Sequence, residues 1–203
     1  GYTPEHNAYP YNYMIGSEAQ RRDAVDYLKL SLEMAKEMGA EFVLTSPANG
    51  GYLATYDQLW SRLEKNIQEL GDYAAKLEIK LVVEALTPYE SNFFTRANDL
   101  VELFRRVDNP YVVGMCDIVP PFVQHESIMA YFDKLGNKMD HMHIIDGENG
   151  SDTHLIPGEG NIPIKEMLYE MKRIGYDKTA TLELVILTNH VFMRNVPLIT
   201  CVS

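Results

Sequence analysis

The chain of 203 residues has few cysteines and no long hydrophobic run, and each shortage excludes a class of protein. Its two cysteines, Cys116 and Cys201, are far apart and form no CxxC pair, which argues against a disulfide framework or a thiolate zinc site. No apolar run approaches the ~20 residues that a membrane helix needs, and the first residues have no signal-peptide pattern. We therefore expect a soluble, cytoplasmic protein with reduced thiols.

Basic residues are also scarce: 18 Lys and Arg stand against 29 Asp and Glu, which gives a formal net charge of −11. A surface of this sign repels nucleic-acid phosphates and anionic membranes, so neither is expected as a partner. Hydrophobic residues make up 46% of the chain, which is enough for a globular domain with one substantial core.

Helix and strand patterns alternate regularly along the sequence. Ser17 and Thr55 each begin a capping box that is followed by apolar residues at helical spacing. Three further helices are expected at about 95–107, 126–135 and 163–174. Strands are expected at five places: 41–45, 80–86, 112–116, 141–145 and 179–185. Such alternation predicts an α/β fold with a parallel sheet.

Four of these strands are nearly continuous apolar runs, as is typical of strands that are covered on both faces. Each run carries one ionisable residue at or near its C-terminal end, and these residues are Glu84, Asp117, His143 and Glu183. In parallel α/β folds the C-terminal ends of the strands form one rim, where active sites are built. We therefore expect the four side chains to converge.

Three carboxylates and one imidazole make a ligand set that suits Mn²⁺, Co²⁺, Ni²⁺, Mg²⁺ or Zn²⁺. For any one of these residues alone, the better explanation is a strand-end residue that meets solvent or caps the next helix. The intervals between the four are each about one βα repeat, so all four occupy equivalent points. This regularity favours a site for one divalent metal ion.

Two loop residues are weaker candidates. Glu90 lies in the loop that leaves the strand of Glu84, where it can overhang the site and bind a hydroxylated ligand, or be a solvated loop acid. His154 lies in the loop after the His143 strand, as a contact for substrate or for a ligand residue, or as a loop histidine bonded to backbone. His141 shares the face of His143 but lies deeper along the strand.

The sequence resembles the sugar isomerase/epimerase family with the xylose isomerase-like barrel in six segments: GYTPEHNAYPYN, VEALTPYESN, MCDI, HMHIID, SDTHLIPGEG and TLELV. This resemblance extends from residue 1 to about Val185. It implies a (β/α)8 TIM barrel with one divalent metal at its C-terminal rim. It also implies Glu84, Asp117, His143 and Glu183 as metal ligands, the two glutamates as catalytic acid and base, and Glu90 as a contact for substrate hydroxyls.

The sequence departs from the family pattern in three places. The clear strands correspond to the last five of the eight in a barrel, and GYTP at residues 1–4 resembles the end of the third, so the first two βα units are expected to be absent. Residues 186–203 differ from the family's closing helix and are expected to form an aberrant C-terminal tail. Pro120 stands where related ketose epimerases have a histidine. We predict one partial TIM-barrel domain over 1–203, with its sheet edges covered in a homo-oligomer or by the tail.

The function that the resemblance implies is metal-dependent epimerisation at C3 of a ketose or a ketoseamine of the fructoselysine type. The C3 hydrogen lies α to the C2 carbonyl, so its removal leaves an enediolate whose charge a metal ion stabilises. Glu84 and Glu183 are expected to remove and return the proton on opposite faces, and Glu90 and His154 to bind the sugar. Two alternatives stay open: a related aldose–ketose isomerase, and a truncated barrel without activity.

Overall fold

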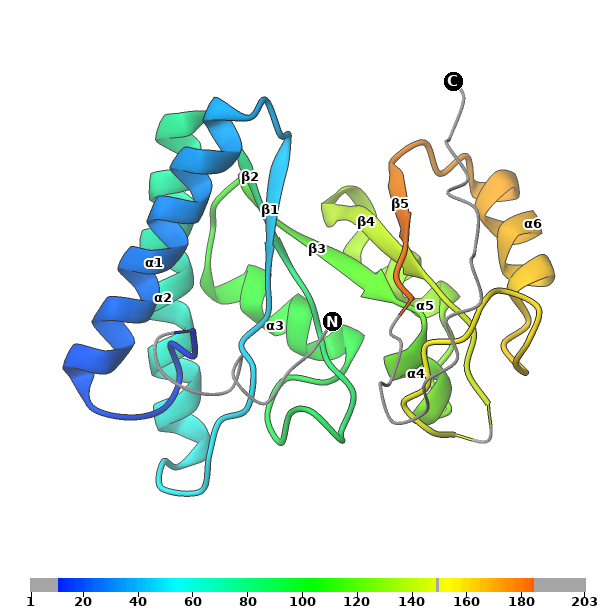
Figure 1. Ribbon diagram of the computed structural model, residues 1–203, viewed down its shortest axis with the longest axis horizontal. Coiled ribbons are helices and arrows are strands. Elements are labelled where there is room, and N and C mark those ends of the chain that lie inside the picture. Colours follow the sequence, from blue (N-terminus) through cyan, green and yellow to red (C-terminus); the bar gives the residue numbers. More distant parts are fainter. Residues whose placement is uncertain (1–10, 149, 185–203) are drawn as a thin grey trace, which may run out of the picture.

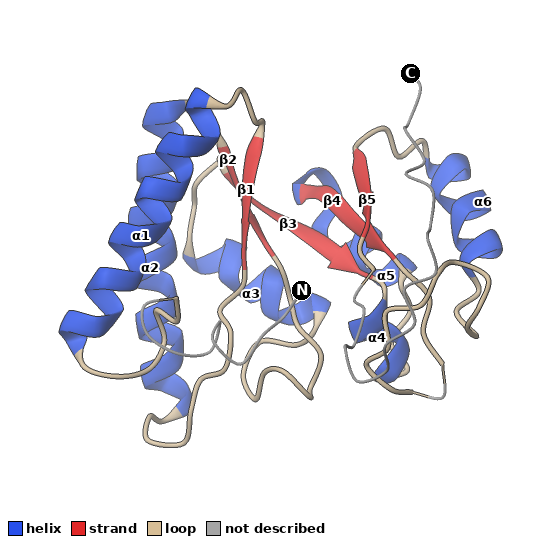
Figure 2. Ribbon diagram, viewed as in Figure 1, coloured by secondary structure: helices blue, strands red, loops and turns tan. Residues whose placement is uncertain are grey.

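The computed structural model describes residues 11–148 and 150–184 (Figure 1). Five parallel strands form one sheet in the order of the chain, and they pair as β1-β2-β3-β4-β5. Their bounds are Phe42–Thr45 (β1), Lys80–Val83 (β2), Val112–Asp117 (β3), Met139–Ile144 (β4) and Thr179–Leu182 (β5). The sheet curls into a half-barrel with the helices on its outer side (Figures 1 and 2), as expected for the last five strands of a TIM barrel.

The described residues form six α-helices, and five of them connect or flank these strands as the sequence predicted. Their bounds are Glu18–Glu37 (α1), Tyr56–Leu77 (α2), Ala97–Arg106 (α3), Met129–Leu135 (α5) and Ile164–Ile174 (α6). Both expected capping boxes are present, since Ser17 accepts from the Gln20 backbone and Thr55 from that of Gln58. Helix α2 buries its apolar stripe, and each leucine or isoleucine side chain in it contributes about 1.5–3 kcal/mol to folding. The residues of that stripe are Leu59, Leu63, Ile67, Leu70 and Ala74.

The region after β3 differs from the prediction. The helix expected from about residue 126 begins at Met129, and a short helix (α4, Val119–Val123) lies between it and the strand. Its first turn contains Pro120 and Pro121, which a first turn tolerates because its N–H groups have no partner within the helix. A 3₁₀ turn (η2, Gly136–Lys138) leads into β4.

Alternation along the strands separates two apolar layers. One side of the sheet packs against the helices in a large core, whereas the concave side holds a small cluster of Val82, Val113 and Met115 with Phe42 and Leu44. Successive side chains on the concave side lead from this cluster to the C-terminal ends of the strands. The curled sheet therefore directs the ionisable strand-end residues into its own interior.

His141 lies on the concave side below His143, as predicted. It is 2% exposed, its ring is 5.4 Å from the ring of His143, and its Nδ1 is 2.7 Å from Thr179 Oγ1. The imidazole also packs against Phe42. His141 is thus a core residue beneath the site.

The prediction of a covered fifth strand is wrong for the described part of it, because all four residues of β5 are exposed at the edge of the sheet. Cys116 is a free, buried thiol, and burial raises its pKa well above the usual range, so it is unreactive. Within the described residues no helix is both long enough and apolar enough to cross a membrane. Residues 1–4, the tail 186–203 and Cys201 lie outside the described residues.

Candidate metal centre and active site

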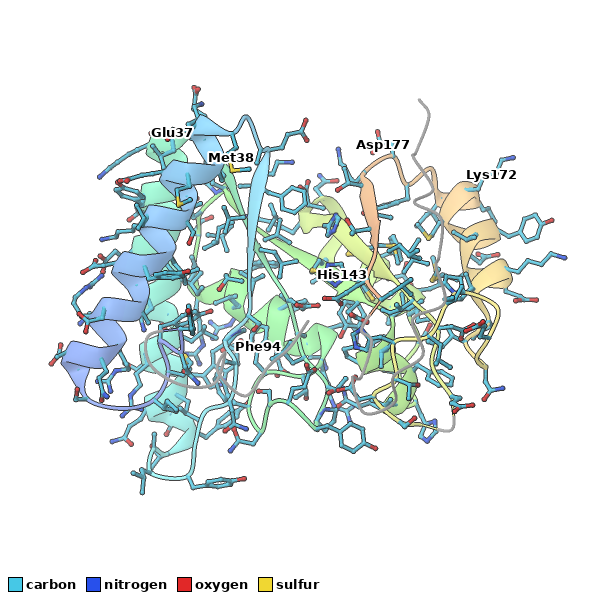
Figure 3. All side chains as sticks on the ribbon, viewed as in Figure 1. Glu37, Met38, Phe94, His143, Lys172 and Asp177 are labelled. Atoms are coloured by element: carbon cyan, nitrogen blue, oxygen red, sulfur yellow. The ribbon has the colours of Figure 1, made fainter. Side chains whose placement is uncertain are left out.

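Four side chains meet at the C-terminal ends of the strands. Glu84 directly follows β2, Asp117 ends β3, His143 is in β4, and Glu183 directly follows β5. One ligand atom from each lies within 4.8 Å of the others. In Figure 3, His143 lies near the middle of the molecule, away from the outer helix ends marked by Met38 and Lys172. The residues that the sequence placed at equivalent strand ends are therefore neighbours.

Nδ1 of His143 is the centre of this cluster. Carboxylate oxygens lie 2.9 Å away in Glu183, 3.3 Å in Glu84 and 3.5 Å in Asp117. The His143 side chain is 10% exposed, and among the described residues its Nδ1 has no partner in hydrogen-bond geometry. Three carboxylates and an imidazole nitrogen that face one point, and do not satisfy one another, fit a divalent cation.

The three buried carboxylates of the cluster need a positive charge among them to balance their negative charges. Burial raises the pKa of Glu84 and raises that of Asp117 to about 6, although His143 opposes both shifts. Burial lowers the pKa of His143, but the three neighbouring carboxylates stabilise its protonated form, overcome this effect and raise the pKa to about 12. Burial favours a higher pKa for Glu183, but the interaction with His143 outweighs it and lowers the pKa to about 2. A cation at this point, whether a proton on His143 or a metal ion, stabilises all three carboxylates.

A cavity of about 390 Å³ opens above the cluster. Its apolar wall includes Val43, Leu44, Val119 and Pro120. The described residues of its lining contain no Lys or Arg, but they contain five carboxylates: Glu84, Glu90, Asp117, Asp152 and Glu183. A cavity of this size and polarity suits a small hydroxylated molecule that is neutral or positively charged.

Glu90 lines this cavity, where its position after Glu84 predicted it. Its Oε2 accepts hydrogen bonds from the backbone N–H of Thr87 (3.1 Å) and from the Thr87 hydroxyl (2.9 Å). Burial and the nearby charge of Asp152 raise the pKa of Glu90 to about 7, against the effect of these hydrogen bonds. The carboxyl group is therefore held in place at the side of the site, and its contact with substrate stays a prediction.

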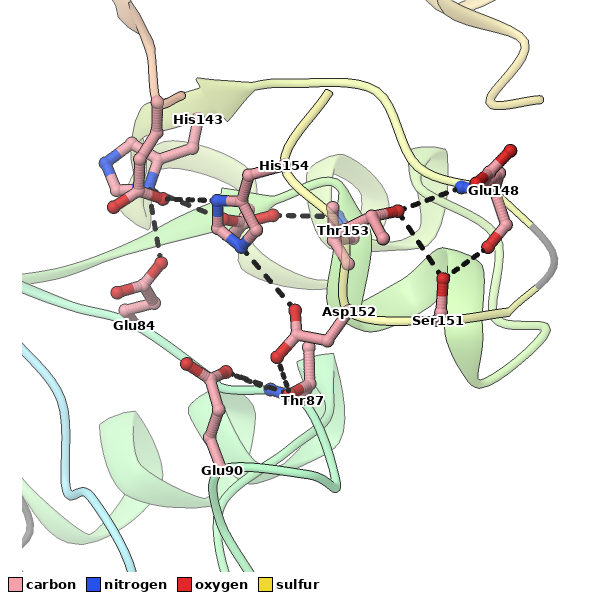
Figure 4. A network of polar contacts seen from close by, with 12 residues as sticks. Glu84, Thr87, Glu90, His143, Glu148, Ser151, Asp152, Thr153 and His154 are labelled. Carbon is pink, nitrogen blue, oxygen red and sulfur yellow. Dashed lines mark hydrogen bonds and ion pairs between the residues drawn. The ribbon is translucent and has the colours of Figure 1, made fainter. Parts of the chain in front are cut away.

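His154 also lines the cavity, and it lies between two carboxylates. Its Nε2 is 3.5 Å from Asp152 Oδ1, and its Nδ1 is 3.8 Å from Glu183 Oε2 (Figure 4). Burial opposes an increase in its pKa, but the interaction with Asp152 and the charges of Asp117 and Glu183 raise the pKa to about 9. These contacts place His154 beside the cluster rather than on the loop backbone.

Asp146 fixes the base of the loop that carries His154. Its carboxylate accepts from the backbone N–H groups of Gly147 (2.9 Å), Gly158 (2.8 Å) and Ile162 (3.0 Å), and residue 146 pairs with Leu155 in a bridge. A Cβ at Gly160 would lie 2.4 Å from Asp146 Oδ1, so only glycine fits there. The PGEG segment (residues 157–160) thus packs against the carboxylate of Asp146.

Two residues of the site were missed by the sequence reasoning. Thr87 bonds to Glu90, and its hydroxyl is also 3.0 Å from Asp152 Oδ2. The only sequence signals were their positions, Thr87 three residues before Glu90 and Asp152 two before His154. Neither spacing shows that the two loops meet.

Comparisons with known proteins identify the family. The sequence pattern described as "xylose isomerase-like TIM barrel" matches residues 3–189, and the chain belongs to this family. Fructoselysine 3-epimerase of Shigella flexneri is 48% identical over 185 residues, which cover 91% of this chain and 67% of that protein. The family predicted from the sequence is therefore confirmed, and the chain spans about two thirds of the length of this relative.

Solved structures share the fold at lower identity. A D-psicose 3-epimerase from Clostridium cellulolyticum H10, solved with D-tagatose, has a TM-score of 0.75 at 19% identity, and the match covers 87% of this chain and 61% of that one. The IOLI protein, solved with a bound zinc atom, has a TM-score of 0.72 at 20% identity, with 85% and 64% covered. Among the relatives and structural neighbours, carbohydrate epimerases recur.

Proposed function

We propose that this protein is an epimerase that depends on one divalent metal ion and inverts C3 of a ketose or a ketoseamine. The observation that carries the proposal is the convergence of Glu84 and Glu183 on His143 at the floor of the cavity. The 48% identity to a fructoselysine 3-epimerase supports the same reaction class. A resident divalent ion supplies a Lewis acid that stabilises negative charge when a proton leaves carbon.

The proposed ligands are Glu84, Asp117, His143 and Glu183, whose donor atoms already lie within 4.8 Å of one another. Glu84 and Glu183 also serve as the acid and base: one carboxylate takes the C3 proton, and the other delivers a proton to the opposite face of the planar carbon. Because the reaction is reversible, the two residues exchange roles between the two epimers.

Glu90 and His154 supply the polar contacts for substrate in this proposal. Both line the cavity, and both are fixed by neighbouring side chains rather than free in solvent. The described lining holds five carboxylates and no Lys or Arg, which favours a neutral sugar or one that carries an ammonium group. A ketoseamine meets this condition.

The test is incubation of the purified protein, loaded with Mn²⁺, with fructoselysine or fructose in D₂O. We expect deuterium at C3 and a new C3 epimer in the NMR spectrum. Exchange at C1 with formation of an aldose assigns the protein instead to the related isomerases, and no exchange by protein with confirmed metal content refutes the proposal. The homo-oligomer, the single domain over 1–203 and the cytoplasmic location stay predictions, which light scattering, limited proteolysis and cell fractionation test.

A further inference from the structure

Asp152 links the two loops that face the site. One carboxylate oxygen, Oδ2, lies 3.0 Å from the hydroxyl of Thr87, and the other, Oδ1, lies 3.5 Å from Nε2 of His154 (Figure 4). On its other side the His154 ring faces Glu183, with Nδ1 3.8 Å from Oε2. A chain of polar contacts thus extends from Thr87, after β2, to Glu183, after β5.

The two loops are docked at a second point as well. The hydroxyl of Tyr89 donates a hydrogen bond to the carbonyl of Gly150 (2.9 Å), two residues from Asp152. Asp146 fixes the base of the same loop through three backbone N–H groups. The backbone around Asp152 is therefore held from both sides, so its side chain has a defined place from which to orient another group.

Two buried atoms along this series of contacts between Thr87 and Glu183 lack hydrogen bonds. Within the described residues, Asp152 Oδ1 and His154 Nδ1 are buried and have no partner in hydrogen-bond geometry. Leaving such atoms unpaired costs about 1–3 kcal/mol each, so native proteins seldom do so without a reason. Each atom faces an ionisable group just beyond bonding distance, and contacts of this kind shorten when an active site binds its ligand.

We propose that Asp152 is a positioning residue, which holds the His154 imidazole so that Nδ1 is directed at Glu183. Closing the 3.5 Å contact between His154 Nε2 and Asp152 Oδ1 to a hydrogen bond fixes which ring nitrogen faces the site, as carboxylates commonly do for functional histidines. The one hydroxyl proton of Thr87 can be donated to Asp152 Oδ2 (3.0 Å) or to Glu90 Oε2 (2.9 Å), and in this proposal its donation to Asp152 holds that carboxylate in place. The contribution of Asp152 to turnover rests on the proposed function, because it requires Glu183 to move a proton. The orientation of the His154 ring does not depend on that function.

The contact between His154 and Asp152 differs from an exposed surface ion pair, which contributes little to stability. The side chains of His154 and Asp152 are 16% and 22% exposed, so water and salt screen their interaction less than they screen exposed pairs. Neither residue meets a Lys or Arg in the described lining of the cavity. Within residues 11–148 and 150–184, the side-chain partners of Asp152 are Thr87 and His154.

The test uses the full chain and two independent measurements on four variants. Asp152→Ala removes the acceptor, Asp152→Asn retains an amide oxygen that can still accept from Nε2–H, and Thr87→Val removes the hydroxyl that holds Asp152. Glu159→Gln is the matched control, because it removes a carboxylate from an exposed position in the same loop. Circular dichroism shows which variants fold. If Asp152→Ala does not fold, Asp152→Asn and Thr87→Val test the proposal in its place.

The first measurement is the long-range ¹H–¹⁵N spectrum of His154, which reports the ring nitrogens without any substrate or metal. In the parent protein and in Glu159→Gln we expect a hydrogen-bearing Nε2 with one fixed set of shifts. In Asp152→Ala, and to a smaller extent in Thr87→Val, we expect the His154 shifts to move toward those of a ring with no fixed orientation. A His154 spectrum that is unchanged in these variants overturns the proposal.

The second measurement is steady-state epimerisation of fructoselysine by the Mn²⁺-loaded protein. Removal of a group that orients a functional histidine typically costs 10–100-fold, so we expect kcat of Asp152→Ala to fall by about that factor with KM within threefold. Asp152→Asn should recover part of the loss. A rise in KM alone would show instead that Asp152 contacts substrate. An inactive parent protein with the expected His154 spectrum refutes the proposed function and leaves the orienting role of Asp152 supported.

Discussion

Glu84 and Glu183 follow strands that do not pair with each other, yet both place a carboxylate oxygen within 3.3 Å of the same nitrogen of His143. Strands β3 and β4 lie between them in the sheet. A flat sheet would hold the two residues apart by three strand spacings of about 4.8 Å each. The curl of the half-barrel therefore creates the site, and any change that flattens the sheet should disperse it.

Metal binding should depend on His143. A ligand that binds only the folded state raises stability by about 2.7 kcal/mol at a concentration 100 times its Kd. We expect Mn²⁺ to raise the melting temperature of the parent protein by several degrees, and of His143→Ala by less than one degree. Asp177→Asn serves as the control, because Asp177 is 81% exposed and lies just before β5, at the opposite end of the strand from Glu183. An equal Mn²⁺ effect on parent and His143→Ala would place the ion elsewhere.

Replacing Glu183 by Gln should stop C3 exchange while some metal affinity remains. The amide keeps an oxygen ligand but cannot accept the proton, and loss of a general base typically costs ~10²–10⁴ in rate. The assay is deuterium incorporation at C3 from D₂O, with calorimetry to measure Mn²⁺ affinity. Exchange at the parent rate in Glu183→Gln would remove this residue from the mechanism.

Glu90→Gln should have a milder effect that falls mainly on substrate binding. Glu90 lines the cavity beside Thr87 and is not one of the four clustered side chains proposed to bind the metal ion. A contact made equally in the ground state and the transition state raises KM and leaves kcat nearly unchanged. We expect KM for fructoselysine to rise about tenfold. A loss confined to kcat would instead give Glu90 a part in proton transfer.

The sequence was sufficient for the parts of the site that depend on strand order, and insufficient for those that depend on how loops meet. Glu84, Asp117 and His143 could be placed because strand alternation and parallel pairing fix the direction of a strand-end side chain. The contact of Thr87 with Asp152 joins two loops through a single hydroxyl, and no periodicity encodes that. Helix α4 was missed because two adjacent prolines indicate a loop unless their place in a first turn is known.

Asp146 should control the stability of the loop that carries His154, in a manner that depends on pH. Burial opposes the shift, but hydrogen bonds from the backbone N–H groups of Gly158, Ile162 and Gly147 lower the pKa of Asp146. The folded pKa is therefore below the unfolded value of about 3.9, so the carboxylate stabilises the fold above that pH, and this contribution is lost as the pH falls through the folded pKa. We expect Asp146→Asn to cost about 1–3 kcal/mol in urea unfolding at pH 7, because the amide satisfies fewer of these donors.

At a pH near the lowered pKa of Asp146, the free energies of unfolding of Asp146→Asn and of the parent protein should differ less than at pH 7. Glu148→Gln, in an exposed position two residues along the same loop, should change the free energy of unfolding by less than about 0.5 kcal/mol at either pH. A deficit of the same size at every pH would mean that the side-chain shape of Asp146, and not its charge, holds the loop.

The charge of the cavity predicts which sugars the protein rejects. Among the described lining residues five are carboxylates and none is Lys or Arg, and one divalent ion together with a protonated His154 offsets only three of the five negative charges. A phosphate group would meet uncompensated negative charge, and like charges brought together cost several kcal/mol. We expect fructose 6-phosphate to bind at least tenfold more weakly than fructose to the Mn²⁺-loaded protein in calorimetry. Because salt screens repulsion, the ratio of the affinity for fructose to that for fructose 6-phosphate should decrease as NaCl is raised from about 0.01 to about 0.5 M. Equal affinities at low salt would show that a cation from outside the described residues reaches the cavity.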